Sequence, residues 1–452
     1  MKKLLLILLL VLTPVFNFSQ VDYPLAKDQK EYLDTLQRRT FNYFLQEINE
    51  KNGLVKDRSA KESPASIAAV GFGLPTFAIA AEKGWIDRKK AYDITLASLK
   101  FFVKSEQSRS PKATGYKGFY YHFLKMNNGK REWKSELSSI DTAWLIAGLI
   151  FCRQYYSGEA PEEIEIRKLS SKLIERVDWN FMQLKSGKHK YGISLGWSPE
   201  EGFHKRAWHG YDESLFIYIL AAGSGMKNPT EAYNVWLSSY VWREPYQGLE
   251  HLIFPPMFGH QYSNMFIDFR NLSDKYMRDK GIDYFENSRR AVLTQQRYAI
   301  ENPLKWKGYG ELMWGLTACD GAEAKNNKDG KEYLGYAARG TSGRDSVLFD
   351  DGTLAPTAVA ASLPFAPEVC LPTLENMRVM YGDKGLWDKY GFQDAFNPTA
   401  EWIATDCLGI DQAPIIIMIE NFYSGLVWKT IMKDPIIKKG LELLDFQLVR
   451  KE

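Results

Sequence analysis

Apolar segments of helix length recur six times along the chain, each rich in Ala, Gly and Leu and poor in charge. A helix that is apolar on all sides is buried, whereas a helix with one charged face lies at the surface. The six segments therefore predict six inner helices. They cover Ser66–Ala81, Asp141–Tyr156, Asp212–Gly223, Gly310–Cys319, Thr353–Pro364 and Asp411–Gly425.

Charged, amphipathic stretches separate these segments and predict an outer layer of helices. The alternation favours an all-α chain folded as a single (α/α)6 toroid, with short β-hairpins in its loops. The alternative is an open helical-repeat array. Such arrays repeat with a fixed period of about 34 to 45 residues, and the apolar segments of this chain do not. The outer stretches are Lys27–Lys51, Arg88–Glu106, Glu162–Lys185, Leu272–Ala299 and Pro367–Tyr381, and the hairpins are expected near Lys190–Ser194 and Ser346–Phe349.

The N-terminus has the pattern of a secretory signal. Two lysines precede an apolar run, Leu4–Val15, which small or polar residues follow. We expect cleavage near Ser19, which assigns residues 1–19 to a signal peptide and 20–452 to one mature domain, periplasmic or secreted. No cysteine follows the run to carry a lipid, and no later apolar run reaches membrane-spanning length, so we expect no membrane anchor.

The charge balance indicates no polyanionic partner. Lys and Arg number 58 against 55 Asp and Glu, a formal net charge of +3, so neither nucleic acid nor an anionic membrane is expected to bind. Aromatic residues are abundant, with 13 Trp, 25 Tyr and 25 Phe, and flat rings stack on sugars as well as filling cores. A chain of this length needs no partner to bury a core, so we expect a monomer.

The cysteines and histidines give no sign of a metal or cofactor. The four cysteines are far apart and form no C-x-x-C pair, which favours buried free thiols, with one disulfide as the alternative. No H-E-x-x-H motif is present among the histidines, so we expect neither metal nor cofactor. The cysteines are Cys152, Cys319, Cys370 and Cys407; the histidines are His122, His189, His204, His209, His251 and His260.

Acidic residues open four of the six inner segments. Each could simply cap its helix, an interaction of about 0.5–2 kcal/mol. In a ring of parallel inner helices, however, the N-termini meet at one mouth, so the carboxylates would converge on one cleft. The acidic residues are Asp141, Asp212 with Glu213, Glu311 and Asp411.

Aromatic residues beside glycines recur in the expected loops around this mouth. They could be core fillers or platforms for a sugar ring, and both interpretations remain open. The candidates for substrate binding are Trp208, Tyr211, His260, Tyr309, Trp314 and Trp402, together with the acids Asp141, Asp212 and Glu311.

Cleavage of a glycosidic bond needs one protonated and one ionised carboxyl group. Glu213 is the candidate general acid, because its apolar neighbours and the charge of Asp212 would raise its pKa. Asp411 is the candidate general base, with Asp406 as its nearest competitor. The sequence does not give their separation, which decides between inversion and retention.

Seven short motifs in order resemble glycoside hydrolase family 144, the bacterial glycoamylase-like proteins that degrade β-1,2-glucan. The resemblance extends from about Gly53 to Val427. The motifs are Asp141-Thr142-Ala143; Gly210-Tyr211-Asp212-Glu213; Gly315–Ala318 with Asp320-Gly321; Asp351-Gly352-Thr353 with Ala355–Ala358; Pro364–Glu368; Gly391–Asn397; and Gly409–Gln412 followed by Pro414.

This resemblance implies an (α/α)6 barrel that hydrolyses β-1,2-glucan to short oligosaccharides, including sophorose, with inversion of configuration. By position, the family's acid falls on Glu213 and its base on Asp411, with Asp141 in the floor of a subsite. In such enzymes the proton can pass through a substrate hydroxyl, so Asp411 need not touch the water. Ala413 departs from the pattern, where a glycine is expected before the proline.

Two other classes of function remain open. A polysaccharide lyase on the same barrel would need a cation to neutralise a uronate, and clustered carboxylates would repel that substrate. A non-catalytic glycan-binding protein would need only the aromatic platforms. Endo or exo action would depend on whether loops such as Asp320–Asp351 block one end of the cleft.

Overall fold

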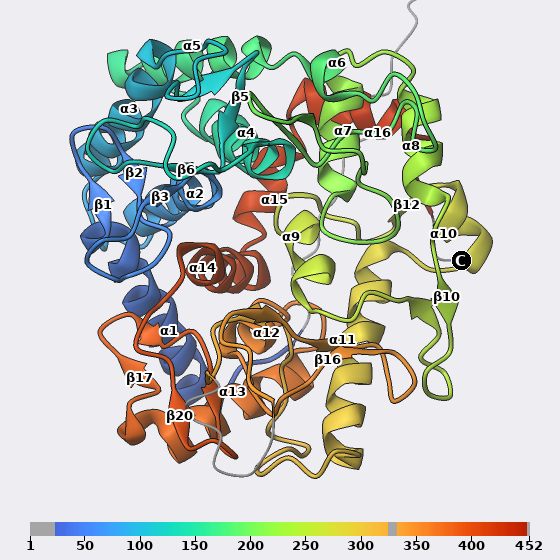
Figure 1. Ribbon diagram of the computed structural model, residues 1–452. Helices are drawn as coiled ribbons and strands as arrows, with labels where there is room; N and C mark the ends of the chain where they lie inside the picture. The colour runs from blue at the N-terminus through green and yellow to red at the C-terminus, as the bar shows by residue number, and fades with distance from the viewer. Residues whose placement is uncertain (1–22, 324–331, 450–452) are drawn as a thin grey trace, which may run out of the picture.

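The computed structural model describes residues 23–323 and 332–449, so the expected signal peptide lies outside the described residues. Within them, six helices form an inner ring, seen nearly end-on in Figure 1. They are α2 (Ile67–Glu82), α4 (Ser139–Tyr155), α7 (Leu215–Gly223), α9 (Phe258–Phe266), α12 (Pro356–Ala360) and α14 (Gly409–Tyr423).

Contacts between successive inner helices close the ring. Helix α2 packs between α4 and α14, α4 contacts α7, and α14 contacts α12. Ser263 on α9 accepts a hydrogen bond from the backbone of Phe216 on α7 (3.0 Å). Gln261 on α9 donates to the carbonyl of Ala358 on α12 (2.8 Å), which completes the circle. The structure therefore has the predicted all-α toroid.

Small residues let the inner helices approach closely. A Cβ added at Gly71 of α2 would lie 2.3 Å from the carbonyl oxygen of Trp144 on α4. A Cβ at Gly148 of α4 would lie 2.2 Å from the carbonyl oxygen of Gly71. Any side chain at either position would push the two backbones apart, so the Gly-rich composition of these segments has a direct packing cause.

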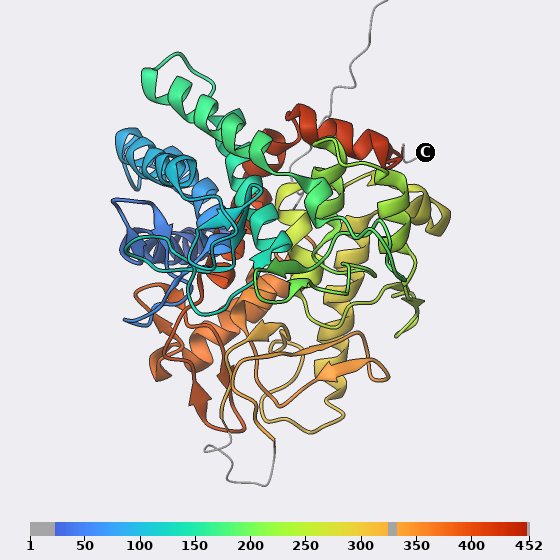
Figure 2. The ribbon, with the colours of Figure 1, turned by 45° about the horizontal axis from the view of Figure 1, so that its top comes forward.

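An outer layer of helices covers the ring. Figure 2 shows α3 and α5 outside α2 and α4, and the contacts agree. The other helices are α1 (Lys27–Gln46), α3 (Arg88–Lys104), α5 (Pro161–Arg176), α6 (Trp179–Met182), α8 (Pro229–Leu237), α10 (Lys275–Lys280), α11 (Tyr284–Glu301), α13 (Pro367–Tyr381), α15 (Leu426–Ile431) and α16 (Pro435–Leu443), with a 3-10 turn at Gly382–Lys384.

The strands are short and lie in the loops. Besides eight two-stranded pairs, the described residues form one five-stranded sheet, which the sequence does not predict. Its order is β4 (Gly115–Tyr116), β5 (Phe119–Tyr121), β7 (Leu137–Ser138), β8 (Gly196–Ser198) and β9 (Gly202–Phe203). Leu137 is paired with Trp197, and β7 leads directly into α4.

The two-stranded pairs are all antiparallel. The expected hairpin at 346–349 is confirmed, whereas residues 190–194 form only isolated bridges. The pairs are β1 (Ile48–Asn49) with β2 (Leu54–Val55), β3 (Ala65–Ser66) with β6 (Phe123–Leu124), β10 (Trp242–Arg243) with β11 (His251–Leu252), β12 (Leu272–Ser273) with β21 (Gln447–Leu448), β13 (Ala318–Cys319) with β14 (Ala337–Ala338), β15 (Gly340–Thr341) with β16 (Val347–Phe349), β17 (Trp387–Asp388) with β18 (Gly391–Phe392), and β19 (Phe396–Asn397) with β20 (Trp402–Ile403).

The sequence predicts one of the six inner helices in the wrong segment, at residues 310–319. Residues 310–319 form an exposed turn at Glu311 and Leu312 and then an extended, mostly buried stretch, in which Gly315 has a φ of 130° and a Cβ would press on the carbonyl of Ala355. The missing inner helix is α9, whose sequence looks like a polar loop. The side-chain N–H groups of its buried Gln261 and Asn264 donate inside the core, to Ser362 and Ser288 among others, which compensates for the burial of these donors.

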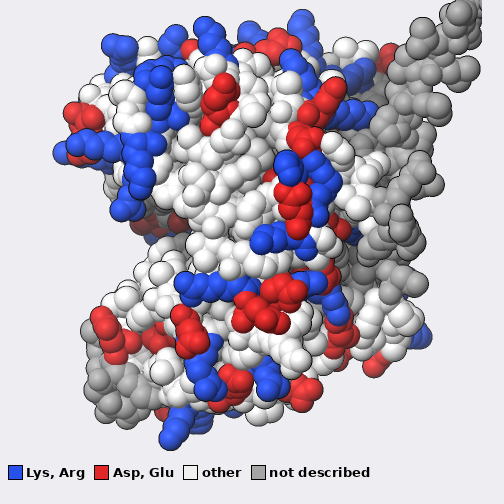
Figure 3. Space-filling view, turned by 90° about the vertical axis from the view of Figure 1, so that its right-hand side faces the viewer, with Lys and Arg blue, Asp and Glu red and all other residues white. Residues whose placement is uncertain are grey.

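Two further expectations concern thiols and membranes. All four cysteines are buried and unpaired, which confirms free thiols over a disulfide. Among the helices in 23–323 and 332–449, none has the length and apolar character required to cross a bilayer. On the face in Figure 3, Lys and Arg are interspersed with Asp and Glu, in keeping with the small net charge.

Candidate active site

A cleft opens where the N-terminal ends of the inner helices meet. Ala68 of α2, Asp141 of α4, Glu213 just before α7, Phe258 of α9 and Ile410 of α14 line one hollow of about 520 Å³. A second hollow of about 820 Å³ adjoins it, and His122, Ile140 and Asp141 line both. The outline of the molecule is indented at the left of Figure 3, the side that faces the viewer in Figure 1.

Glu213 lies in the wall of this cleft, at the start of α7. Ser263 of α9 donates a hydrogen bond to its backbone carbonyl (2.6 Å), which ties the residue to the neighbouring inner helix. Burial raises the pKa of the Glu213 carboxyl well above its usual value, and the charges of Asp212 and Asp141 raise it further. A raised pKa favours the protonated carboxyl group that a general acid needs.

Asp411 lies in the first turn of α14, next to the lining residue Ile410. Its side chain is 3% exposed, and burial raises its pKa well above the usual value, with the charge of Asp394 as the next cause. The hydroxyl of Tyr262, which lines the cleft, donates to the carbonyl of Ile410 (3.3 Å). The charges of Asp411 and Glu213 both act on Tyr262, so this ring lies within reach of the two carboxyls.

Asp141 has a cationic partner that the sequence analysis did not single out. The Nδ1 atom of His122 lies 3.6 Å from Asp141 Oδ2 and 3.1 Å from Glu136 Oε1. Burial alone would lower the pKa of His122, but Asp141 and Glu136 raise it to about 9. Ser138, the cap of α4, also donates to the Asp141 carboxylate. The group presents an ion pair to the cleft.

The ligand atoms of His122, Glu136 and Asp141 lie within 4.8 Å of one another, a spacing that would suit a metal ion. A metal ligand must be a neutral imidazole, however, and the pKa of about 9 makes His122 an imidazolium at neutral pH. A proton and a metal ion would compete for the same ring of His122, so a metal could bind there only if the imidazolium gave up its proton.

Aromatic rings line both parts of the cleft. Trp208, a predicted substrate-binding residue, lines the larger hollow, and its Nε1 donates to Ser139 Oγ at the start of α4 (2.9 Å). Trp197 lines the same hollow from β8. Trp144 and the 65% exposed Trp133 line the smaller one. The sequence analysis does not single out Trp144 or Trp133, because nothing in their local sequence separates them from core aromatics.

Asp406, the alternative base, lies in a different environment from Asp411. It accepts from Ser59 Oγ (3.3 Å) and lies 3.8 Å from Arg58. Arg58 lines the cleft and is also paired with Asp320 (3.1 Å). Because Ser59 and Arg58 already contact the carboxylate of Asp406, Asp411 is the better candidate for the base.

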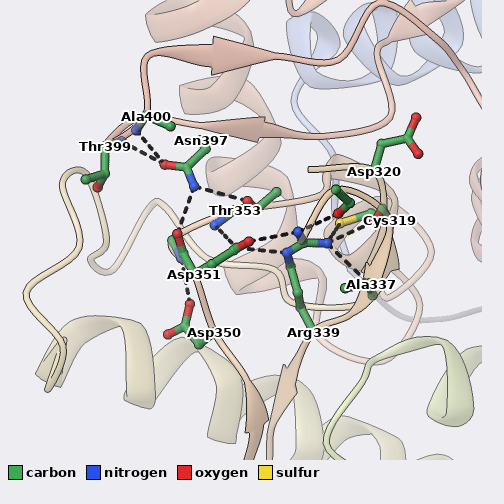
Figure 4. A network of polar contacts seen from close by, with 12 residues as sticks. Cys319, Asp320, Ala337, Arg339, Asp350, Asp351, Thr353, Asn397, Thr399 and Ala400 are labelled. Carbon is green, nitrogen blue, oxygen red and sulfur yellow. Dashed lines mark hydrogen bonds and ion pairs between the residues drawn. The ribbon is translucent and has the colours of Figure 1, made fainter. Parts of the chain in front are cut away.

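The wall carrying Asp320 is anchored by a buried ion pair (Figure 4). The guanidinium of Arg339 donates to both carboxylate oxygens of Asp351 at 2.8 Å and to the carbonyl of Cys319 at 2.9 Å. Asp320 follows Cys319 directly, and in Figure 4 its carboxylate points away from this network. Arg339 and Asp351 therefore position the chain that carries Asp320, without themselves reaching the cleft.

Three candidates from the Trp208–Glu213 segment and α9 prove to be structural. Asp212 accepts from the backbone N–H of Ser214 (2.8 Å) in the turn just before α7. Tyr211 packs in the core, stacked on Tyr284. His260 is fully buried with its pKa lowered to about 3 by burial, and its ring contacts the carbonyl of Phe254.

The remaining four candidates also lie outside the cleft, which corrects the prediction that all would meet there. The hydroxyl of Tyr309 donates to Asp350 (2.7 Å), and Trp314 is buried in the core. Glu311 is exposed, because its segment is not an inner helix. Trp402, which belongs to β20, lines a separate hollow of about 440 Å³.

Comparison with known proteins agrees with this arrangement. The family described as "Putative glucoamylase" (Glycoamylase) matches residues 205–435. A crystal structure of "a putative glucoamylase" from Bacteroides uniformis is 31% identical, with a TM-score of 0.81 over 94% of this chain and 99% of that chain. The endo-β-1,2-glucanase from Chitinophaga pinensis, solved with sophorotriose and glucose, is 28% identical, with a TM-score of 0.80 over 94% of this chain and 99% of that chain.

A curated relative is the exo β-1,2-glucooligosaccharide sophorohydrolase (non-reducing end) of Parabacteroides distasonis. It is 29% identical over 462 residues, which cover 94% of this chain. The chain spans 59% of the length of that relative. With the fold, the cleft at the inner-helix N-termini and these matches together, the chain belongs to the bacterial glycoamylase-like family.

Proposed function

We propose that this protein is a glycoside hydrolase that cleaves β-1,2-linked glucans to short oligosaccharides. The observation that carries the proposal is the pair of carboxyls, Glu213 in the cleft wall and Asp411 behind it, both with pKa values raised by burial. Similarity to β-1,2-glucan-cleaving enzymes across 94% of this chain supports the choice of substrate.

Glu213 acts as the general acid in this mechanism. Its raised pKa favours the protonated form, and the proton passes to the glycosidic oxygen as the bond to the anomeric carbon breaks. Proton donation prevents the leaving group from departing as an alkoxide, a contribution of about 10²–10⁴-fold in rate.

Asp411 acts as the general base that removes a proton from the attacking water. With only 3% of its surface exposed, it is poorly placed to reach an anomeric carbon directly, which disfavours a covalent glycosyl-enzyme intermediate. Proton transfer, in contrast, can be relayed through a water molecule or a substrate hydroxyl. We therefore propose hydrolysis with inversion of configuration.

Asp141 and the aromatic rings hold the substrate. The Asp141–His122 ion pair offers charge-assisted hydrogen bonds to sugar hydroxyls, and the rings of Trp208 and Trp133 offer flat faces to the C–H surfaces of glucose. The larger hollow extends this surface to one side of Glu213, enough for more than the two sugars that flank the cleaved bond.

The alternatives fit the cleft less well. A lyase would need Arg58 to neutralise a uronate, but this guanidinium is already paired with Asp320, and the surrounding carboxylates would repel the substrate. A glycan-binding protein needs no buried acid with a raised pKa in its wall, because burying such a group costs free energy.

We further propose that the protein is exported and acts as a monomer, in the periplasm or the medium. The support for export is the predicted signal peptide, residues 1–19. N-terminal sequencing of the mature protein tests it, with a start near Gln20 expected and an intact Met1 against it. Light scattering of the purified protein tests the monomer.

The test of the activity is incubation of residues 20–452 with linear β-1,2-glucan, with soluble starch and β-1,3-glucan as controls. We expect oligosaccharides from the β-1,2-glucan alone. A ladder of sizes would indicate endo action, and a single disaccharide would indicate exo action. A folded protein that releases nothing from β-1,2-glucan would contradict the proposal.

A further inference from the structure

Asp394 is a buried carboxyl group to which the proposed mechanism so far gives no part. It lies between β18 and β19, is 2% exposed and acts on the carboxyl group of Asp411 of α14. Its Oδ2 accepts the backbone N–H of Asp320 (2.7 Å), and its own N–H donates to the carbonyl of Asp406 (3.2 Å). Both contacts fix the carboxyl beside the candidate base.

The two carboxyl groups must share a proton. Asp411 Oδ2 and Asp394 Oδ1 are both buried, and among the described residues no other side chain or backbone group donates to either atom. Two ionised carboxylates have only acceptors and cannot bond to each other, so one of them must carry the hydrogen. With Oδ2 of Asp394 already accepting from Asp320, the proton on Asp411 gives the better-satisfied arrangement.

The surrounding charges favour this sharing. The carboxylates of Asp57 and Asp320 act on Asp411, and Asp320 also acts on Asp394. Arg58 faces the pair from the same wall but is divided among Asp57 (3.8 Å), Asp320 (3.1 Å) and Asp406 (3.8 Å). Tyr262 is buried and Tyr336 is half exposed, and both hydroxyls act on Asp411; loss of solvent around each hydroxyl raises its pKa above 10, so both stay neutral. A second buried negative charge would therefore have little compensation.

We propose that Asp394 is a positioning residue for the base: it takes the proton of Asp411 as Asp411 takes one from the attacking water, an inference that rests on the proposed hydrolysis. The O–H bond of the water breaks, its oxygen bonds to the anomeric carbon, and its proton passes to Asp411. The original proton of Asp411 moves to Asp394, while Glu213 gives its proton to the leaving oxygen. Exchange with solvent then returns one proton to Glu213 and removes one from the pair.

The variant Asp394→Asn separates this role from a purely structural one. The amide keeps the size of the side chain but can only donate to Asp411, so the acceptor is lost. Two causes that raise the pKa of Asp411, the charge of Asp394 and the hydrogen bond to it, disappear, and that pKa falls. A base of lower pKa without a proton acceptor behind it accepts protons less readily.

The experiment is the pH dependence of kcat and kcat/KM on β-1,2-gluco-oligosaccharides for wild type and Asp394→Asn. We expect kcat to fall about 10²-fold with KM changed less than about threefold, and the acidic limb of the profile to move to lower pH. Asp406→Asn is the matched control, because it alters the neighbouring wall without touching Asp411, and its acidic limb should stay at the wild-type position.

The outcomes separate the two proposals. An inactive wild type would overturn the proposed function, whereas an active wild type with an unmoved acidic limb in Asp394→Asn would overturn this inference alone. If Asp394→Asn does not fold, Asp394→Glu takes its place. It retains a carboxyl group, so the acidic limb should stay at the wild-type position while kcat falls, and a displaced limb would contradict the shared proton.

Discussion

Asp141 and Asp411 occupy the same place on two inner helices and have opposite surroundings. Each is the third residue of its helix, α4 or α14, and each follows an isoleucine. Asp141 accepts a hydrogen bond from Ser138 and faces the His122 imidazolium. Asp411 has Asp394, another acid, as its side-chain partner.

This difference separates binding from catalysis on a symmetric scaffold. Burial raises the pKa of both carboxyls, but His122 and Ser138 oppose the rise for Asp141, whereas Asp394 adds to it for Asp411. The compensated acid, which contacts a cation and a hydroxyl, is suited to holding a substrate hydroxyl. The uncompensated acid exchanges protons. The position on the helix sets where a carboxyl points, and its partners set what it does.

The largest expected effect is the loss of turnover in Glu213→Gln and in Asp411→Asn. Each amide removes a proton donor or acceptor from the reaction, so we expect kcat to fall at least about 10³-fold. Binding of a β-1,2-gluco-oligosaccharide, measured by calorimetry, should stay within a few-fold of wild type. Either variant retaining wild-type kcat would remove that residue from the mechanism.

Asp141→Asn should weaken binding more than turnover. Loss of a charge-assisted hydrogen bond costs about 1.5–3 kcal/mol, so we expect KM to rise about tenfold or more. If kcat instead fell as far as in Asp411→Asn, with KM unchanged, the contrast between the two helix positions would be wrong.

Trp208→Ala and Trp402→Ala test which aromatic residues bind substrate. Trp208 lines the larger hollow of the cleft, so its loss should raise KM roughly fivefold to tenfold, an effect of about 1–1.5 kcal/mol. Trp402 lines another hollow, so Trp402→Ala should leave KM unchanged. Steady-state kinetics on oligosaccharides of increasing length measures both.

The smallest effect concerns the stability of the His122 ion pair. The pKa of His122 is raised from 6.5 to about 9 in the folded protein. The ion pair therefore stabilises the fold fully below pH 6.5, and this stabilisation is lost as the pH rises through 9. Between pH 7 and pH 9 the Tm of the wild type should therefore fall more than that of His122→Gln. Parallel curves for the two proteins would show that His122 is neutral when folded.

The sequence predicts the two layers of helices well, but it does not predict the polar inner helix α9 or the extended apolar segment 310–319. Five inner helices could be found because their segments are apolar throughout. Helix α9 could not, since Gln261 and Asn264 look solvent-exposed until their partners in the core are known. The segment 310–319 was wrongly predicted to be a helix for the opposite reason. Its apolar residues from Met313 onward are buried, but in an extended chain around Gly315.

The same limit applies to the site. Glu213 and Asp411 stand out in sequence because they begin apolar helices, a local signal. Asp394 and His122 do not, since their significance comes from partners such as Asp411 and Asp141, which lie 17 and 19 residues away in the chain. Tyr211 and Trp208 look alike in sequence, and only packing assigns one to the core and the other to the cleft.

The most direct test of the account is the anomeric configuration of the first products released from β-1,2-glucan, followed by proton NMR immediately after enzyme is added. A base that acts on water opposite Glu213 predicts new reducing ends that appear first as the α anomer and then equilibrate. Initial release of the β anomer would mean a covalent intermediate and would contradict the part given to Asp411.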